Sequence, residues 1–142
     1  SMNTRQLGDI GLLRVATFLV EHGISVSIPF TDSLRYDLIA DWKGKLYKVQ
    51  VKNNKIIKNG TIIPIITTST NYKKGKWVQK EYNNIDWFIV YCRDNQKFYL
   101  LYPKELTKNT RAIWLRLYPA KNNQKKRTNL AEEFEIEKRL DL

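Results

Sequence analysis

Hydrophobic residues recur at helical spacing near the start of the chain and at alternating positions through much of the remainder. An apolar stripe over residues 4–21 predicts a helix, and His22-Gly23 is a typical helix end. Alternating or apolar runs then predict strands at 24–29, 85–92, 97–102 and 112–118. Pro64 lies within the apolar run 62–66, which predicts an edge strand or an extended segment.

The end of the chain carries a second helix signal. Asn129 followed by Glu132 has the spacing of a capping box and predicts a helix to about Leu140. Its apolar residues Phe134, Ile136 and Leu140 either form a contact surface for another subunit or close the core. The order helix, several strands, helix predicts an α+β (α/β) fold in which helices flank a mixed central sheet. We expect residues 3–142 to form a single domain.

Alternation over residues 36–52 predicts two short strands joined by a two-residue turn at Lys43-Gly44. Glycine tolerates the positive φ that such turns require. This turn pairs Asp37 with Gln50 and places Asp37, Gln50 and Lys52 on one face. Opposite Cβ atoms lie about 4.5–5.5 Å apart, and diagonal neighbours about 7–8 Å. A carboxylate, an amide oxygen and an ammonium group should therefore converge on a space for one hydrated divalent ion.

These groups match the requirements of phosphodiester hydrolysis. A carboxylate can hold Mg²⁺, which keeps several waters and offsets charge on the phosphate. A second oxygen ligand and a nearby lysine can orient or activate the attacking water. We predict Asp37, Gln50 and the backbone carbonyl of Val51 as Mg²⁺ ligands, and Lys52 as the residue that positions the water. The alternative is structural, with Asp37 as a capping or salt-bridge carboxylate and Lys52 as an ordinary strand lysine.

The charge distribution indicates a polyanionic partner. The net charge is +11, and no Asp or Glu lies between Trp42 and Lys80, a stretch that holds many lysines. With one histidine and one cysteine, the chain has no set of ligands for structural zinc and no internal disulfide. No apolar run is long enough to cross a membrane. We expect nucleic acid to be the partner.

Two basic loops, at 70–80 and 120–128, are the predicted DNA contacts. The residues expected to bind there are Tyr72, Lys73, Lys74, Lys76, Trp77, Lys121, Gln124, Lys125, Lys126 and Arg127. Phosphate contacts supply affinity and register, whereas base reading requires groove contacts. Candidates for base reading are Asn71, Gln79, Asn83, Arg111 and Gln124. The sequence does not indicate which of them contact bases. The aromatic residues expected in the core are Trp87, Phe88, Tyr91, Tyr99 and Trp114.

The residues Gly11, Gly23, Pro29, Asp37 and Gln50-Val51-Lys52 together resemble the PD-(D/E)XK nuclease superfamily. The Asp-then-Gln-x-Lys form is most similar to the small homing endonucleases of bacterial group I introns. That resemblance implies a restriction-endonuclease-like core and Mg²⁺-dependent, sequence-specific cleavage of double-stranded DNA. It also implies a homodimer or homotetramer, because one subunit has one site and double-strand cleavage needs two. The expected location is the bacterial or phage-infected cytoplasm, in association with the nucleoid.

One position departs from the family pattern. A glutamate often stands on the first helix of these nucleases, eleven residues before the terminal glycine, and here that residue is Leu12. Asp9 lies one helical turn earlier on the same face of the helix, but its side chain is shorter than that of glutamate. Three explanations fit a leucine at this position. The chain is a natural variant that needs fewer metal ligands, it carries an introduced inactivating change, or it is a non-catalytic DNA-binding protein. A Holliday-junction resolvase or a restriction-type nuclease is the alternative within the superfamily.

Overall fold

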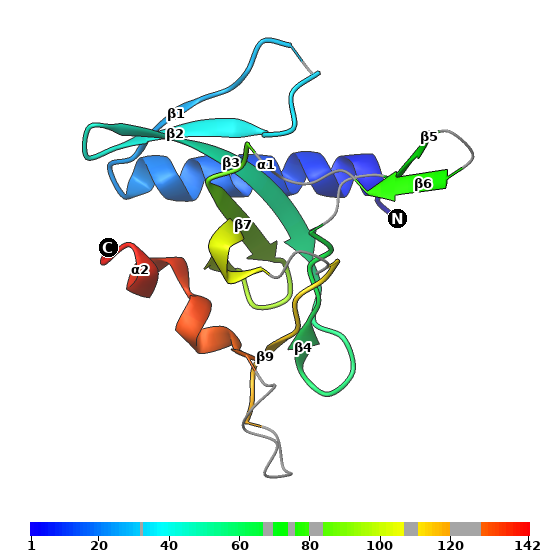
Figure 1. The fold of residues 1–142 in the computed structure, drawn as a ribbon. Helices are drawn as coiled ribbons and strands as arrows, with labels where there is room; N and C mark the ends of the chain where they lie inside the picture. The colour runs from blue at the N-terminus through cyan, green and yellow to red at the C-terminus, as the bar shows by residue number, and fades with distance from the viewer. Residues whose placement is uncertain (32, 67–69, 74–75, 80–83, 107–110, 120–128) are drawn as a thin grey trace.

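A five-stranded mixed sheet forms the centre of the protein, seen here in a computed structural model (Figure 1). The structure describes the chain except residues 32, 67–69, 74–75, 80–83, 107–110 and 120–128, and only the backbone of 70–73 and 76–79. The strand order is β1-β2-β3-β7-β8. These strands are β1 (Ser25–Ser27), β2 (Leu38–Trp42), β3 (Lys45–Asn54), β7 (Trp87–Cys92) and β8 (Lys97–Leu101). Among these five strands only β3 and β7 pair in parallel, which confirms the predicted mixed sheet.

The first helix, α1 (Thr4–Glu21), has the bounds that its periodicity predicts. Asn3 and Gln6 form a capping box at its start, and Gly23 follows its end with a φ of +77°. Val15 and Leu19 of α1 are fully buried against the central sheet. None of the helices in the described part of the chain has the length and apolar character needed to span a bilayer.

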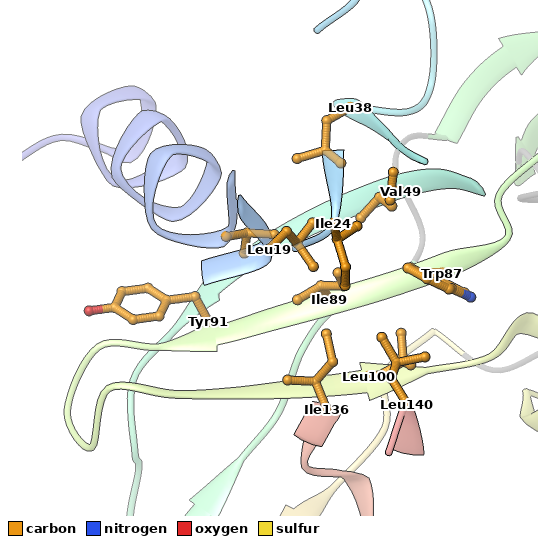
Figure 2. Packing of buried hydrophobic residues seen from close by; sticks show 12 residues of the cluster. Leu19, Ile24, Leu38, Val49, Trp87, Ile89, Tyr91, Leu100, Ile136 and Leu140 are labelled. Carbon is orange, nitrogen blue, oxygen red and sulfur yellow. The ribbon is translucent and has the colours of Figure 1, made fainter. Parts of the chain in front are cut away.

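Helices cover one face of the sheet, and a smaller sheet covers the other. On the first face, Leu19 of α1 and Ile136 of α2 (Ile136–Arg139) meet Val49, Ile89 and Leu100 from the central strands (Figure 2). The second face packs against three short strands in the order β10-β9-β4. Their bounds are β4 (Thr61–Ile62), β9 (Leu115–Arg116) and β10 (Asn129–Leu130). Both faces of β7 are therefore buried, which explains its continuous apolar run.

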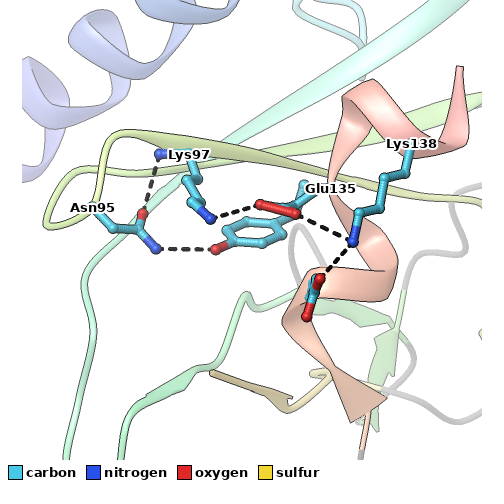
Figure 3. A network of polar contacts seen from close by, with 6 residues as sticks. Asn95, Lys97, Glu135 and Lys138 are labelled. Carbon is cyan, nitrogen blue, oxygen red and sulfur yellow. Dashed lines mark hydrogen bonds and ion pairs between the residues drawn. The ribbon is translucent and has the colours of Figure 1, made fainter. Parts of the chain in front are cut away.

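The prediction of one continuous C-terminal helix is wrong. Asn129 lies in β10, and a 3-10 helix, η2 (Ala131–Phe134), precedes the single turn of α2. Glu135 interrupts them with an extended backbone, φ −57° and ψ 131°, and forms a β-bridge with Tyr99. Its carboxylate also pairs with Lys97 and Lys138 (Figure 3). Edge pairing with β8 thus overrides the local helix propensity of this acidic segment.

The apolar residues of this C-terminal segment close the core. Ile136 is fully buried, and Leu140 and Phe134 are 4% and 7% exposed. Phe134 packs on one face of the central sheet, whereas Ile136 packs on the other. The segment therefore crosses the edge of the sheet at β8 and does not offer these side chains to another subunit.

Two further expectations need correction. Residues 70–80, predicted as a loop, contain a two-stranded ribbon of β5 (Thr70–Lys73) and β6 (Lys76–Gln79). Trp114, predicted in the core, is 60% exposed. Its neighbours Ile113 and Leu115 are buried, and because side chains alternate along a strand, Trp114 must face outward. A 3-10 helix, η1 (Pro103–Glu105), follows β8.

Alanine substitution at two glycines of α1 should change the stability of the fold in opposite directions. A Cβ at Gly8 meets nothing within 4 Å, whereas one at Gly11 lies 3.0 Å from Cβ of Asn53. Asn53 has little freedom to move, because its amide donates to Leu7 O and its Oδ1 accepts from Arg93. We expect Gly8→Ala to stabilise the fold by about 0.5–1 kcal/mol through helix propensity, and Gly11→Ala to destabilise it by about 1–3 kcal/mol. Urea unfolding of both variants checks this, and stabilisation by Gly11→Ala would contradict the close helix–strand contact.

Candidate active site

The β2–β3 hairpin has the predicted register from its turn to Leu38 and Val49, but the predicted pair of Asp37 with Gln50 is not part of it. Trp42 pairs with Lys45, and Ile39 with Lys48, across the turn at Lys43-Gly44. Both turn residues have positive φ, +50° and +78°, the values of a type I′ turn. Tyr47 on this hairpin stacks on Trp87, with ring centroids 4.1 Å apart, which fixes the hairpin against the core.

The two strands of the hairpin separate at Asp37. Pairing of β2 with β3 ends at Leu38 and Val49, while β3 continues along β7 to Asn54. The Asp37 amide donates to Val49 O at 2.8 Å. The Val51 amide then donates to Oδ2 of Asp37 at 2.7 Å, so the carboxylate takes the place of the missing strand. We call this place the fork; it fixes the carboxylate against the backbone of β3.

Gln50 and Lys52 lie on the same face of β3, beside the fork. They pair with Phe88 and Val90 of β7, and all three predicted side chains, Asp37 included, are partly buried. Oε1 of Gln50 is buried and accepts no hydrogen bond from the described part of the chain. An unpaired buried acceptor costs about 1–3 kcal/mol. A ligand with a positive charge or a hydrogen-bond donor would satisfy this oxygen.

Burial shifts both charged groups of the fork away from their ionised forms. Desolvation raises the pKa of Asp37 above its ordinary value of 3.8, although the Val51 amide and the charge of Lys52 oppose the shift. Desolvation lowers the pKa of Lys52, against the opposing effect of the Asp37 charge. Opposed shifts of this kind are typical of sites that exchange protons during catalysis.

The donor set fits a hard divalent cation. A residue in a strand directs its N–H and C=O to the same side, so the Val51 carbonyl faces the edge where its amide meets Asp37. The second oxygen of Asp37, Oε1 of Gln50 and this carbonyl are oxygen ligands of the kind that Mg²⁺ prefers. Within the described residues, no three His, Cys, Asp or Glu side chains form a cluster that could hold a metal. An ion at the fork would therefore rely on amide, carbonyl and water ligands beside carboxylate.

The sequence matches the PD-(D/E)XK endonuclease family over residues 2–137. The chain belongs to the PD-(D/E)XK endonuclease family. It is therefore a nuclease by descent, and this family generally uses divalent metal ions. The fold is similar to that of the bacterial homing endonuclease I-Ssp6803I, with a TM-score of 0.77 and 24% identity over 99% of this chain and 94% of that one. No curated protein sequence matches the chain.

In this PD-(D/E)XK endonuclease, Leu12 occupies the position at which the resemblance in the sequence led us to expect a glutamate. It is partly buried and contacts the core cluster that contains Val15. A Cβ added at the adjacent Gly11 would lie 3.6 Å from Cγ1 of Val51, so α1 passes the same part of β3 as the fork. Asp9, the nearby acidic residue on α1, has an exposed side chain.

Two positioning residues were missed in the sequence. Asp86 accepts a 2.8 Å hydrogen bond from the Lys48 amide, and its own amide donates to Lys48 O. Asn53 joins the start of α1 to β3 through its 2.7 Å bond to Leu7 O. Both fix how β3 meets its neighbours, and neither has a sequence signal, because a single polar residue beside a strand has many possible roles.

The predicted DNA-contact residues are only partly placed. Tyr72 and Lys73 lie in β5, and Lys76 and Trp77 in β6, with Tyr72 opposite Trp77 in the register. Figure 1 shows this ribbon projecting from the molecule near the start of α1. The remaining ones, Lys74, Lys121, Gln124, Lys125, Lys126 and Arg127, lie outside the described residues. Their roles stay predictions.

The raised pKa of Asp37 gives a prediction for stability against pH. The folded chain holds the Asp37 proton more tightly than the unfolded chain, so the contribution of Asp37 to stability falls as pH rises from below 3.8 through the folded pKa. Asp37→Asn keeps an acceptor for the Val51 amide and loses this titration. We therefore expect the stability of Asp37→Asn, relative to wild type, to increase over that pH range. Urea unfolding at a series of pH values measures the difference, and a constant or decreasing difference would contradict a desolvated carboxylate.

Proposed function

We propose that this protein is a Mg²⁺-dependent, sequence-specific endonuclease of the homing type that cleaves double-stranded DNA. The observation that carries the proposal is the fork. There the Val51 amide fixes the Asp37 carboxylate, whose charge acts on Lys52, and Oε1 of Gln50, on the same face of β3 as Lys52, is buried without a partner among the described residues. Phosphodiester hydrolysis needs an oxygen-ligated metal and a positioned water, and these residues supply both requirements.

Each residue has a distinct task in this proposal. Asp37 and Gln50, with the Val51 carbonyl, would hold Mg²⁺, which when bound offsets negative charge on the scissile phosphate and acidifies its water. Lys52 orients the attacking water. Burial lowers the pKa of Lys52, which enlarges the fraction of its amine that is neutral, and only the neutral amine can accept the proton of the water. The hydrogen bond from Val51 keeps the Asp37 carboxylate at one position throughout, so no reorientation precedes the reaction.

The proposal extends to the assembly and its location. The net charge of +11 favours duplex DNA as the substrate, because phosphate neutralisation supplies most sequence-independent affinity. One chain carries one fork, so cutting both strands at one target requires a homodimer or homotetramer that reads a pseudo-palindrome. The protein would act in the bacterial or phage-infected cytoplasm, on nucleoid DNA.

Leu12 favours a second candidate function. A leucine cannot ligate a metal, and its packing against the core shows that the position is used structurally. A DNA-binding protein with a decayed catalytic site would keep the fold and the charge and lose efficient cleavage.

The test compares wild type with Leu12→Glu on supercoiled plasmid DNA carrying candidate targets, with and without Mg²⁺. We expect Mg²⁺-dependent nicking that Leu12→Glu accelerates, because a glutamate there adds a carboxylate ligand. Lys52→Ala in either background should lower the rate by about 10²–10⁴-fold, the usual contribution of a proton-transfer group. Lys48→Ala, which removes an exposed lysine from the same strand, is the matched control and should cut normally.

Three other results would count against the proposal in different ways. Tight DNA binding without cutting by either chain supports the decayed-site protein. If Lys52→Ala and Lys48→Ala lower the nicking rate equally, Lys52 has no special role and the fork is not the catalytic site. Absence of DNA affinity at low salt contradicts both candidate functions.

A further inference from the structure

The small sheet presents an outward face that the fork does not use. Segments 60–66 and 111–118 run antiparallel: Thr61 pairs with Arg116, Ile62 with Leu115, and Ile65 forms a bridge with Ala112. The Ile66 amide donates to Arg111 O and the Leu117 amide donates to Gly60 O, which extends this pairing at both ends. We call these two paired segments the outer ribbon.

The two faces of the outer ribbon differ in how far their apolar side chains are exposed to solvent. The inner residues Ile62, Ile66 and Leu115 are at most 2% exposed and pack against the central sheet. On the outer face, Ile65, Trp114 and Tyr118 are 61%, 60% and 66% exposed. Large apolar side chains gathered on an exposed face mark interaction sites more often than single exposed ones do.

Arg116 lies between the two aromatic residues on this outer face. Its side chain is partly buried, and its buried Nε donates to no acceptor within the described part of the chain. No ion pair of Arg116 with a described acidic residue exists either. A partly buried guanidinium without a counter-charge from the described residues is suited to an anionic partner.

The surrounding charge identifies that partner. The sequence has no Asp or Glu from 42 to 80 or from 106 to 128, and the outer ribbon is built from these two stretches. A symmetric contact with a second copy would place this one-signed surface against itself, which like charges oppose. A polyanion meets no such repulsion. DNA is the partner of this fold family that fits the aromatic and arginine face.

The geometry also suits a duplex. Trp114, Arg116 and Tyr118 alternate with inward residues, so neighbours on the outer face are about 6.8 Å apart. That spacing is close to two base steps of about 3.4 Å along one strand, and the major groove admits a two-stranded β-ribbon. The small sheet covers the face of β7 that carries Phe88 and Val90, the partners of Gln50 and Lys52. Figure 1 shows β4 and β9 beyond the far end of β3.

We propose that the outer ribbon is a DNA-contact surface, in which Arg116 binds a phosphate while Trp114 and Tyr118 pack on sugars or bases beside it. This inference rests on the proposed function, since it assigns part of the substrate contact to residues away from the fork. The predicted DNA contacts at 70–80 and 120–128 do not include these aromatic residues. The outer ribbon thus adds a third element to the DNA-binding surface.

The test measures binding of the full chain to a random-sequence DNA duplex by fluorescence anisotropy over a series of salt concentrations. Arg116→Gln should weaken binding by about tenfold at low salt and reduce the slope of log K against log salt by roughly one. Trp114→Ala should weaken binding by about tenfold with an unchanged slope, because an aromatic contact releases no counterions. Trp114→Phe keeps an aromatic face and should retain most of the affinity.

Matched controls lie on α1, which packs on the opposite face of the central sheet. Arg14→Gln makes the same charge change as Arg116→Gln, and Leu13→Ala removes an apolar side chain that is 67% exposed. Both should bind within about twofold of wild type, with an unchanged salt slope for Leu13→Ala. Circular dichroism of every variant confirms that the fold is kept.

The outcomes separate the two proposals. If wild type does not bind duplex DNA at low salt, the proposed function fails. If wild type binds and the Arg116 and Trp114 variants bind equally well, the outer ribbon is not a contact and the proposed function stands. If sedimentation shows that Trp114→Ala dissociates an oligomer, the ribbon is an interface between copies and the DNA assignment is overturned.

Discussion

The hydrogen bond from the Val51 amide to the Asp37 carboxylate determines what this structure can do. It occurs where β2 ends and β3 continues, so a side chain replaces a strand at that point. The bond holds one carboxylate oxygen at the backbone and leaves the other for a ligand. Without it, Asp37 would be a solvated residue in a loop, and Gln50 and Lys52 would be ordinary members of a strand.

The fork also explains an uneven distribution of stability. Burial disfavours the charged forms of both Asp37 and Lys52, and Oε1 of Gln50 is buried without a described partner. These costs are concentrated at one place, while Gly11 against Asn53 and the stacked Tyr47 and Trp87 hold the surrounding elements firmly. Proteins commonly keep such local costs where a ligand or a reaction repays them.

The sequence was sufficient for the parts of the fold that depend on local signals. Residues at helical spacing predicted α1, and the Lys43-Gly44 turn predicted the register of β2 with β3, although the predicted pair of Asp37 with Gln50 lies beyond the last paired residues. The interruption at Glu135 could not be predicted, because it depends on a bridge to Tyr99, far away in the sequence. The exposure of Trp114 could have been predicted, since the alternation that buries Ile113 and Leu115 requires it. Trp114 was assigned to the core because it is a large aromatic residue, although the alternating pattern of its strand places it on the outside.

The long stretches without acidic residues connect the fork to the rest of the surface. One stretch contains Lys52 and β4, and the other contains β9 and Arg116. Because the small sheet packs on the central sheet, these two stretches meet in the fold, and in the proposed complex with DNA they would form one basic side of the molecule. A long polyanion could contact this side at several points, with the fork as the place of reaction.

The central claim is that Asp37, Gln50 and the Val51 carbonyl form one divalent-cation site. The most direct measurement is the paramagnetic broadening of backbone amide signals by Mn²⁺ in the isotope-labelled protein. We expect the amides of Val51 and its neighbours to broaden first, and Asp37→Asn to abolish this effect. Asp86→Asn, which alters the carboxylate bound to the Lys48 amide, should preserve it. Broadening that is unchanged in Asp37→Asn, or that begins elsewhere in the chain, would contradict the account.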